Sequence, residues 1–182
     1  MTINNRRSTA VLFSLLTVFF SGCLSLKPGT QKSGKSYYET FFVGEDGTQY
    51  YVKPLTFKEI DQKGELIVDM TFRYKDEVKD SASINFSILS PDIIKQVDSL
   101  IISNDSSNIA ANSIKIMFNE KLKKNFKSRF SCKSEFKDLI ELMKDENWRI
   151  SVFYGQNNRT YSSTKKTSKK IKRLNDNVFI VF

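Results

Sequence analysis

Apolar and polar residues alternate along much of the chain from residue 37 onward, and this period of two is typical of half-buried β-strands. The alternation is clearest over residues 66–74, where five apolar or aromatic side chains point one way: Leu66, Val68, Met70, Phe72 and Tyr74. Three shorter segments repeat the pattern: residues 84–88, residues 148–154, and Ile114, Ile116 and Phe118. Each segment is expected to place its apolar face in a core.

Two further expected strands, residues 37–43 and 49–52, flank the sequence Gly-Glu-Asp-Gly at residues 44–47. Glycine readily adopts the positive φ that short hairpin loops need. These two strands are therefore predicted to form a β-hairpin.

Apolar residues at helical spacing predict two amphipathic helices between the strands. The first would begin at Ser90 as N-cap, with Pro91 in its first turn, and continue to Ile101. The second would begin at Ser134 and present a stripe of apolar side chains that ends at Met143. Both helices are expected to pack on the sheet.

A third helix is expected over residues 162–174, and its polar face is strongly basic. With Ile171 directed at the core, the basic side chains lie about 100° or more away around the helix. They are Lys165, Lys166, Lys169, Lys170, Lys172 and Arg173. The helix is thus expected to have a narrow packing face and a broad cationic one.

The last five residues, 178–182, read Val-Phe-Ile-Val-Phe and are apolar on both faces, which predicts a central strand. Strands followed by mixed strands and helices indicate an α+β fold. We expect a largely antiparallel sheet of about six to eight strands, with two or three helices packed on one side.

The N-terminal pattern differs from the rest, because Arg6 and Arg7 precede an apolar run over residues 10–20. As a helix rising about 1.5 Å per residue, this run covers about half of a ~30 Å hydrocarbon core, so it indicates a secretory signal peptide and not a transmembrane helix. Ser21 and Gly22 then lead directly to Cys23.

The order of basic residues, apolar run and Phe20-Ser21-Gly22-Cys23 resembles the lipobox of bacterial lipoproteins. The resemblance implies cleavage before Cys23, a diacylglyceryl group on its thiol and an acyl chain, such as palmitate, on the new amino end. An ordinary signal peptide cut near Cys23 is the alternative. Leu24 follows the cysteine where Asp would signal inner-membrane retention in enteric lipoproteins, so the resemblance favours the outer membrane.

The residues after Cys23 predict a tether followed by one domain. Residues 24–36, LSLKPGTQKSGKS, show no apolar periodicity. The expected organisation is a signal peptide over residues 1–22, a lipidated N-terminus and flexible linker over residues 23–36, and a single α+β domain over residues 37–182. Because no later segment reaches the ~18 consecutive apolar residues of a transmembrane helix, we expect the lipid to be the membrane anchor.

Composition narrows the chemistry, because the chain has no histidine, two cysteines and a net charge of +9. The absence of histidine excludes Ser-His-Asp and Cys-His catalysis and every site with a histidine ligand. No glycine-rich phosphate motif is present. We therefore expect no cofactor.

Two possible sites have simpler structural explanations. Cys132 alternates with Phe130 on one face of an expected strand, so it is interpreted as a buried core residue and not as a reactive thiol. Asp76, Glu77 and Asp80 are interleaved with lysines and lack the spacing of a calcium loop, so they are interpreted as a charged hairpin tip.

The candidate partner-binding surface combines the cationic helix with the polar loop before it, residues 155–161, which contains Arg159 and Tyr161. Its expected partners are anionic: lipid headgroups, an anionic polymer such as lipopolysaccharide, or an acidic envelope protein. A solvated helix face is the alternative. A nucleic-acid partner is not expected, because an exported protein leaves the compartment that holds nucleic acid. Tyr161 is also a single aromatic residue and offers no platform on which successive bases could stack.

These observations favour a non-enzymatic lipoprotein of the bacterial envelope, in which a membrane-anchored domain binds or scaffolds a partner at the periplasmic or outer face. Two alternatives stay open. One is a histidine-free hydrolase that uses a pair of carboxylates on envelope sugars or peptides. The other is a small inhibitor or immunity-like protein that forms one tight complex with an enzyme.

Replacement of the lipobox cysteine tests the anchor. Wild-type protein expressed in bacteria should carry acyl chains on Cys23 and fractionate with membranes, whereas Cys23→Ala should carry none, because the modified thiol is gone. Mass spectrometry of the N-terminal peptide makes the measurement. An unmodified, soluble wild-type protein would contradict the resemblance.

Overall fold

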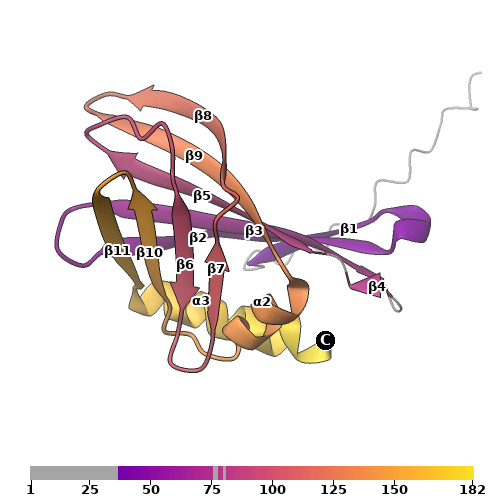
Figure 1. Ribbon diagram of the computed structural model, residues 1–182. Helices are drawn as coiled ribbons and strands as arrows, with labels where there is room; N and C mark the ends of the chain where they lie inside the picture. The colour runs from indigo at the N-terminus through magenta and orange to yellow at the C-terminus, as the bar shows by residue number, and fades with distance from the viewer. Residues whose placement is uncertain (1–36, 76–77, 80) are drawn as a thin grey trace, which may run out of the picture.

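The protein is described by a computed structural model that covers residues 37–75, 78–79 and 81–182. Strands hold 55% of these residues and helices 19%. All described strands belong to one antiparallel sheet, which curls into half of a barrel (Figure 1). The fold is therefore mainly β, and the expected α+β class with two or three helices packed on a sheet of six to eight strands is wrong.

The sheet contains eleven strands among the described residues. The first six are β1 (Tyr38–Phe42), β2 (Thr48–Glu59), β3 (Glu65–Lys75), β4 (Val78–Lys79), β5 (Ala82–Ser90) and β6 (Ser99–Ser103). The others are β7 (Asn108–Ala111), β8 (Lys115–Leu122), β9 (Asn125–Ser134), β10 (Arg149–Tyr154) and β11 (Asn157–Ser163). Their spatial order is β7-β6-β10-β11-β2-β3-β5-β9-β8, with β1 paired to β2 and β4 paired to β3.

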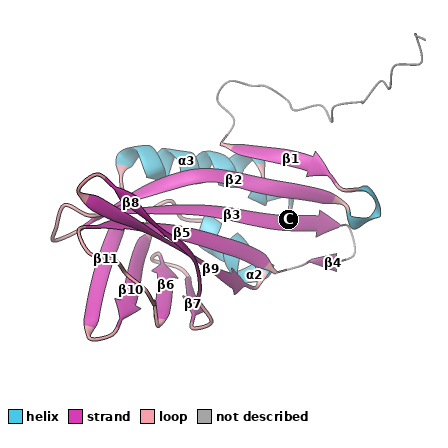
Figure 2. Ribbon diagram, turned by 90° about the horizontal axis from the view of Figure 1, so that it is seen from above, coloured by secondary structure: helices cyan, strands magenta, loops and turns pink. Residues whose placement is uncertain are grey.

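Four short helical elements accompany the sheet in the described part of the chain: η1 (Gly44–Asp46), α2 (Phe136–Met143), α3 (Lys165–Asn177) and η2 (Phe179–Val181). The sheet curls over α2 and α3, which lie along its open side (Figures 1 and 2). The concave face of the sheet is therefore closed by the C-terminal half of the chain.

The strand with the clearest alternation is confirmed. In β3, Leu66, Val68, Met70 and Phe72 are buried on the concave face, whereas the residues between them are partly exposed. Its neighbours β2 and β5 pair with it along most of its length. The period of two thus identified both the strand and its buried face.

The expected N-terminal hairpin is also confirmed, because β1 pairs with β2 across the turn at residues 44–47. Gly44 and Gly47 have φ values of 65° and 85°. A Cβ atom added at Gly47 would lie 2.3 Å from the carbonyl oxygen of Tyr74. Position 47 therefore needs glycine both for its backbone angle and for the close approach of β3.

The helix expected from Ser90 to Ile101 does not form. Ser90 ends β5, and its Oγ accepts a hydrogen bond from Asp92 N at 3.3 Å, a turn that does not continue into a helix. Further along, Leu100 and Ile102 are buried two residues apart in β6, which pairs with β10. The apolar residues at the end of this segment also fit a period of two, and pairing with β10 stabilises them as a strand instead of a helix.

The C-terminal strand expected at residues 178–182 is wrong as well. Residues 179–181 form the short helix η2, in which Phe179 is buried while Ile180 and Val181 are exposed. Phe179 packs with Phe72 of β3 and Phe136 of α2, at ring-centroid distances of 5.2 and 6.2 Å. The aromatic partners of Phe179, and not the local periodicity, determine the helical conformation of these last residues.

The two other helices form close to their predicted positions. In α2, which begins at Phe136, three residues of the expected stripe are buried, Phe136, Leu139 and Met143. Ile140 is only partly buried, and Leu142 is buried in addition. In α3, Thr167, Ile171 and Leu174 are buried, as the angular positions around Ile171 predicted.

Replacement of Phe72 tests the importance of the aromatic cluster. Phe72 is 2% exposed, and removing its ring leaves a cavity among several aromatic partners, so Phe72→Ala should lower the free energy of unfolding by about 3–5 kcal/mol. Phe42, which is 73% exposed, is the matched control, and Phe42→Ala should change the free energy by no more than about 0.5 kcal/mol. Urea denaturation measures both values. Equal losses of unfolding free energy in the two variants would contradict the packing of Phe72 in the core.

Candidate functional site

Helix α3 is fixed to the sheet by its cap and its apolar stripe. Thr164 is the N-cap, and its Oγ1 accepts a hydrogen bond from Thr167 N at 3.2 Å. The Thr167 hydroxyl donates in turn to the carbonyl oxygen of Thr56 in β2. Because Ile171 and Leu174 are buried below this cap, the helix cannot rotate without exposing apolar side chains.

The cationic face of α3 points away from the core, as the sequence predicted. Five of its side chains are exposed and Lys170 is half-buried. Within the described part of the chain, four of the lysines have no ion pair: Lys165, Lys166, Lys169 and Lys172. These charges are free to meet an external anion.

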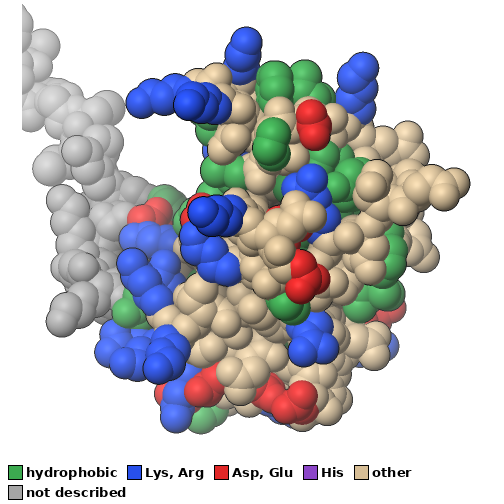
Figure 3. Space-filling model, turned by 90° about the vertical axis from the view of Figure 1, so that its left-hand side faces the viewer, with side chains coloured by type: hydrophobic (Ala, Val, Ile, Leu, Met, Phe, Trp, Pro, Cys, Tyr) green, Lys and Arg blue, Asp and Glu red, His purple; other side chains and the backbone are tan. Residues whose placement is uncertain are grey.

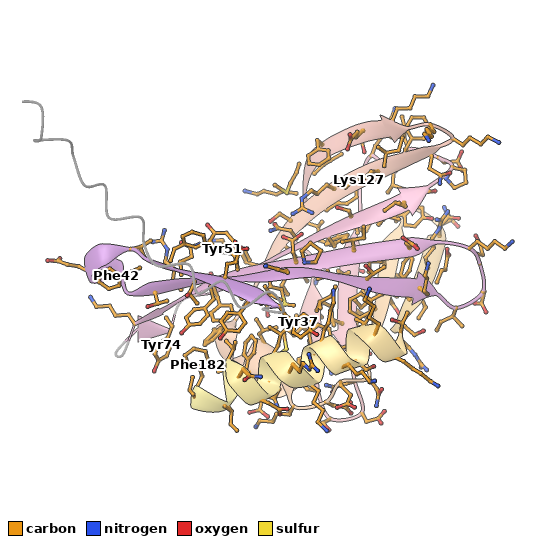
Figure 4. The ribbon with its side chains drawn as sticks, turned by 180° about the vertical axis from the view of Figure 1, so that it is seen from behind. Tyr37, Phe42, Tyr51, Tyr74, Lys127 and Phe182 are labelled. Carbon is orange, nitrogen blue, oxygen red and sulfur yellow. The ribbon has the colours of Figure 1, made fainter. Side chains whose placement is uncertain are left out.

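The remaining two cations contact Tyr37, the first residue of the described structure. Arg173 Nη1 donates a hydrogen bond to the Tyr37 hydroxyl at 2.8 Å, and its guanidinium lies 5.5 Å from the ring centroid. Lys170 Nζ lies 5.9 Å from the same ring and donates to the carbonyl oxygen of Pro54 at 3.2 Å. Figure 4 shows Tyr37 between the β1–β2 hairpin and α3. The segment that follows residue 36 is thus held beside the cationic face.

The polar loop expected at residues 155–161 is mostly strand. Only Gly155, with φ 55°, and Gln156 form the turn, and β11 begins at Asn157. Arg159 and Tyr161 therefore lie in β11 rather than in a loop.

The structure does not bring Arg159 and Tyr161 to the cationic face. Tyr161 is fully buried, and burial, with a contribution from the Glu59 carboxylate, raises its pKa to about 12. The Arg159 guanidinium lies against Glu59, with Nε 3.8 Å from Oε1. Glu59 Oε2 is buried and has no hydrogen-bond partner among the described residues, and a Cβ added at Gly64 would lie 1.9 Å from it. These residues form a packed polar group at the end of β2.

A second exposed surface, on β8, was missed by the sequence analysis. Ile116, Met117 and Phe118 are 47%, 53% and 42% exposed. The expectation that Ile114, Ile116 and Phe118 share one buried face is wrong, because the pairing register with β9 shifts between Ile116 and Phe118. The available signal was three consecutive apolar residues in a lysine-rich stretch.

Polar side chains also form a network across the outer face of β3, β5 and β9. Asp69 accepts two hydrogen bonds from Arg129, at 2.8 and 3.0 Å, and a third from Asn85 at 3.0 Å. Arg129 donates another bond to Ser87. Because the Asp69 and Arg129 side chains are mutually satisfied and mostly buried, this network is structural and not a binding site.

Other sequence expectations can be placed only in part. Cys23, Asp76, Glu77 and Asp80 lie outside the described residues. Among the described residues, no group of three or more His, Cys, Asp or Glu side chains could hold a metal ion. No helix in that same part of the chain has the length and apolar character needed to cross a bilayer.

Comparisons of the chain with models of protein families, with curated proteins and with solved structures gave no match.

The thiol of Cys132 gives a test of the β9 assignment. It is buried beside β5, with Sγ 3.7 Å from the Ile84 carbonyl oxygen, and burial raises its pKa to about 11. In native protein, iodoacetamide at pH about 8 should therefore leave Cys132 unmodified, since the reactive thiolate is scarce and inaccessible. Mass spectrometry measures the modification.

Unfolded protein in urea is the control for this measurement. There Cys132 should react at once, because its pKa returns to the value of an exposed thiol. Equal rates in native and unfolded protein would contradict the buried position.

Proposed function

We propose that the protein is a lipid-anchored binding module of the bacterial envelope, whose cationic α3 face holds the domain against a phosphate-bearing membrane surface. The observation that carries this proposal is the contact of Arg173 and Lys170 with Tyr37. It joins the cationic face to the point at which the proposed tether enters the domain. The anchor would be the acylated Cys23, and the outer membrane is the favoured location.

The length of the tether supports this arrangement. Between Cys23 and Tyr37 the chain could extend by at most about 45 Å, and a flexible coil of that length spans about half as much. The end of the tether is held beside α3, so the cationic side chains are within reach of the bilayer that carries the anchor.

Electrostatics supports the same orientation. A lysine or arginine near an anionic membrane surface contributes about 1 kcal/mol, and this attraction decays within about 8 Å at physiological salt. Four α3 lysines lack an internal partner within the described structure: Lys165, Lys166, Lys169 and Lys172. A lipid anchor keeps the protein at the membrane, and these charges would select which side of the domain faces it.

Lysine footprinting in nanodiscs tests the orientation. Acylated mature protein should show several-fold slower acetylation of the α3 lysines in phosphatidylglycerol nanodiscs than in phosphatidylcholine nanodiscs, because the net negative charge of phosphatidylglycerol draws the amines to the surface and shields them. High salt should remove the difference, since it screens exposed charges. Peptide mass spectrometry reports each lysine separately.

Two triple variants sharpen this test. Lys165→Glu, Lys166→Glu and Lys169→Glu together should abolish the protection of Lys172. The control changes three exposed lysines outside α3 to Glu, namely Lys63, Lys95 and Lys133. It should preserve the protection of Lys172 at the same net charge. Identical acetylation of Lys172 in both kinds of nanodisc would contradict the proposal.

A further inference from the structure

Strand β8 forms an open edge of the curled sheet. It is the last strand in the spatial order, and among the described residues only β9 pairs with it. All eight of its residues are exposed. An edge strand presents alternate backbone N–H and C=O groups to solvent, and these groups can pair with an added strand.

Apolar side chains lie on both faces of this edge. Ile116 pairs with Phe130, whose side chain faces the core, whereas Phe118 pairs with Arg129, whose side chain faces outward. The extra residue between them is Met117, at the register shift. An added strand would therefore meet apolar contacts above and below its backbone.

The charge around this edge is strongly positive. Between residues 115 and 127 the only acidic residue is Glu120. The basic residues of the same stretch are Lys115, Lys121, Lys123, Lys124 and Lys127. Figure 3 shows hydrophobic side chains beside Lys and Arg side chains in the upper part of the face to which the β8–β9 hairpin belongs. The Lys127 ammonium, labelled in Figure 4, lies 5.8 Å from the centroid of the Phe118 ring.

We propose that β8 binds an extended acidic segment of a partner protein by strand addition. After the register shift, residues 118–122 of β8 pair regularly with β9. At about 3.4 Å per residue, they provide an edge about 17 Å long. Backbone hydrogen bonds hold the segment, alternate apolar side chains pack on Phe118 and Leu122, and carboxylates meet the lysines. Opposite-charge pairs across strands stabilise such an addition.

A second copy of this chain is disfavoured as the occupant. Pairing of β8 with β8 would bring the lysines of two hairpins together, with one glutamate from each stretch to offset them. Lysines and a bulge are devices by which edge strands avoid self-association. The same lysines attract an acidic strand, so they select the partner as well as preventing aggregation.

The membrane is disfavoured as the occupant by the position of β8. In Figure 1, β8 lies at the opposite end of the molecule from α3. Under the function proposed above, α3 faces the bilayer that holds the anchor, and β8 then points away from it. The β8 surface is thus directed toward a partner in the adjoining compartment.

Peptide binding tests the proposal on the acylated mature protein in non-ionic detergent. The probe is a fluorescent peptide of alternating glutamate and valine, and anisotropy measures its affinity. It should bind about tenfold more tightly than a lysine-valine peptide, because the positive charge around the edge attracts carboxylates and repels ammonium groups. A glutamate-valine peptide in which some of the valines are replaced by proline should also bind weakly, since proline removes N–H donors of strand addition.

Charge reversal at the edge is the decisive variant. Lys115→Glu with Lys121→Glu should shift the preference toward the lysine-valine peptide, whereas Lys165→Glu with Lys169→Glu on α3 should leave it unchanged. All four side chains are exposed, so the variants should keep the wild-type thermal transition. The α3 double variant should alter the nanodisc footprint and the β8 double variant should alter peptide binding. The membrane proposal and the strand-addition proposal can therefore fail independently of each other.

Several outcomes would overturn the proposal. They are the absence of binding by the glutamate-valine peptide, equal binding of the proline peptide, and insensitivity to the β8 substitutions. Sedimentation equilibrium that showed a dimer lost in Phe118→Ser would identify a second copy as the occupant. Protection of Lys121 from acetylation by phosphatidylglycerol nanodiscs would identify a membrane instead.

Discussion

The burial of Phe72 is the interaction on which the rest of the structure depends. A single curled sheet exposes its concave face unless other elements of the chain cover it, and here that cover comes from the C-terminal half. Phe72 of β3 stacks on Tyr50 at 4.9 Å and contacts Phe136 at 4.6 Å and Phe179 at 5.2 Å. One ring thus joins two adjacent strands to α2 and to the end of the chain.

This arrangement also separates the two surfaces that we propose to be functional. Since the apolar stripe of α3 is held in the core, its lysines must face outward at one end of the molecule. The curl of the sheet carries its open edge, β8, to the other end (Figure 1). If the domain is tethered as we propose, its cationic face would lie near the anchor and its pairing edge far from it, so it could link a membrane to a partner protein.

Sequence periodicity was most reliable where one face is buried along a whole element. In β3 the alternation from Leu66 to Phe72 predicted strand and core together, and Ile171 defined the buried side of α3. The prediction failed at residues 90–101, where apolar spacing fitted a helix but β10 offered a partner strand. It failed again in β8, because one extra residue at Met117 moves Phe118 to the opposite face.

The candidate surface was likewise predicted only in part. By itself the sequence determined the β-hairpin at Gly44 and Gly47, the alternation of β3 and the cationic face of α3, because these depend on backbone angles and on residues close together in the chain. Only the tertiary structure placed Tyr37 against Arg173, buried Tyr161 and left β8 at an edge. Those outcomes depend on which distant strands and rings meet, and local periodicity carries no information about such partners.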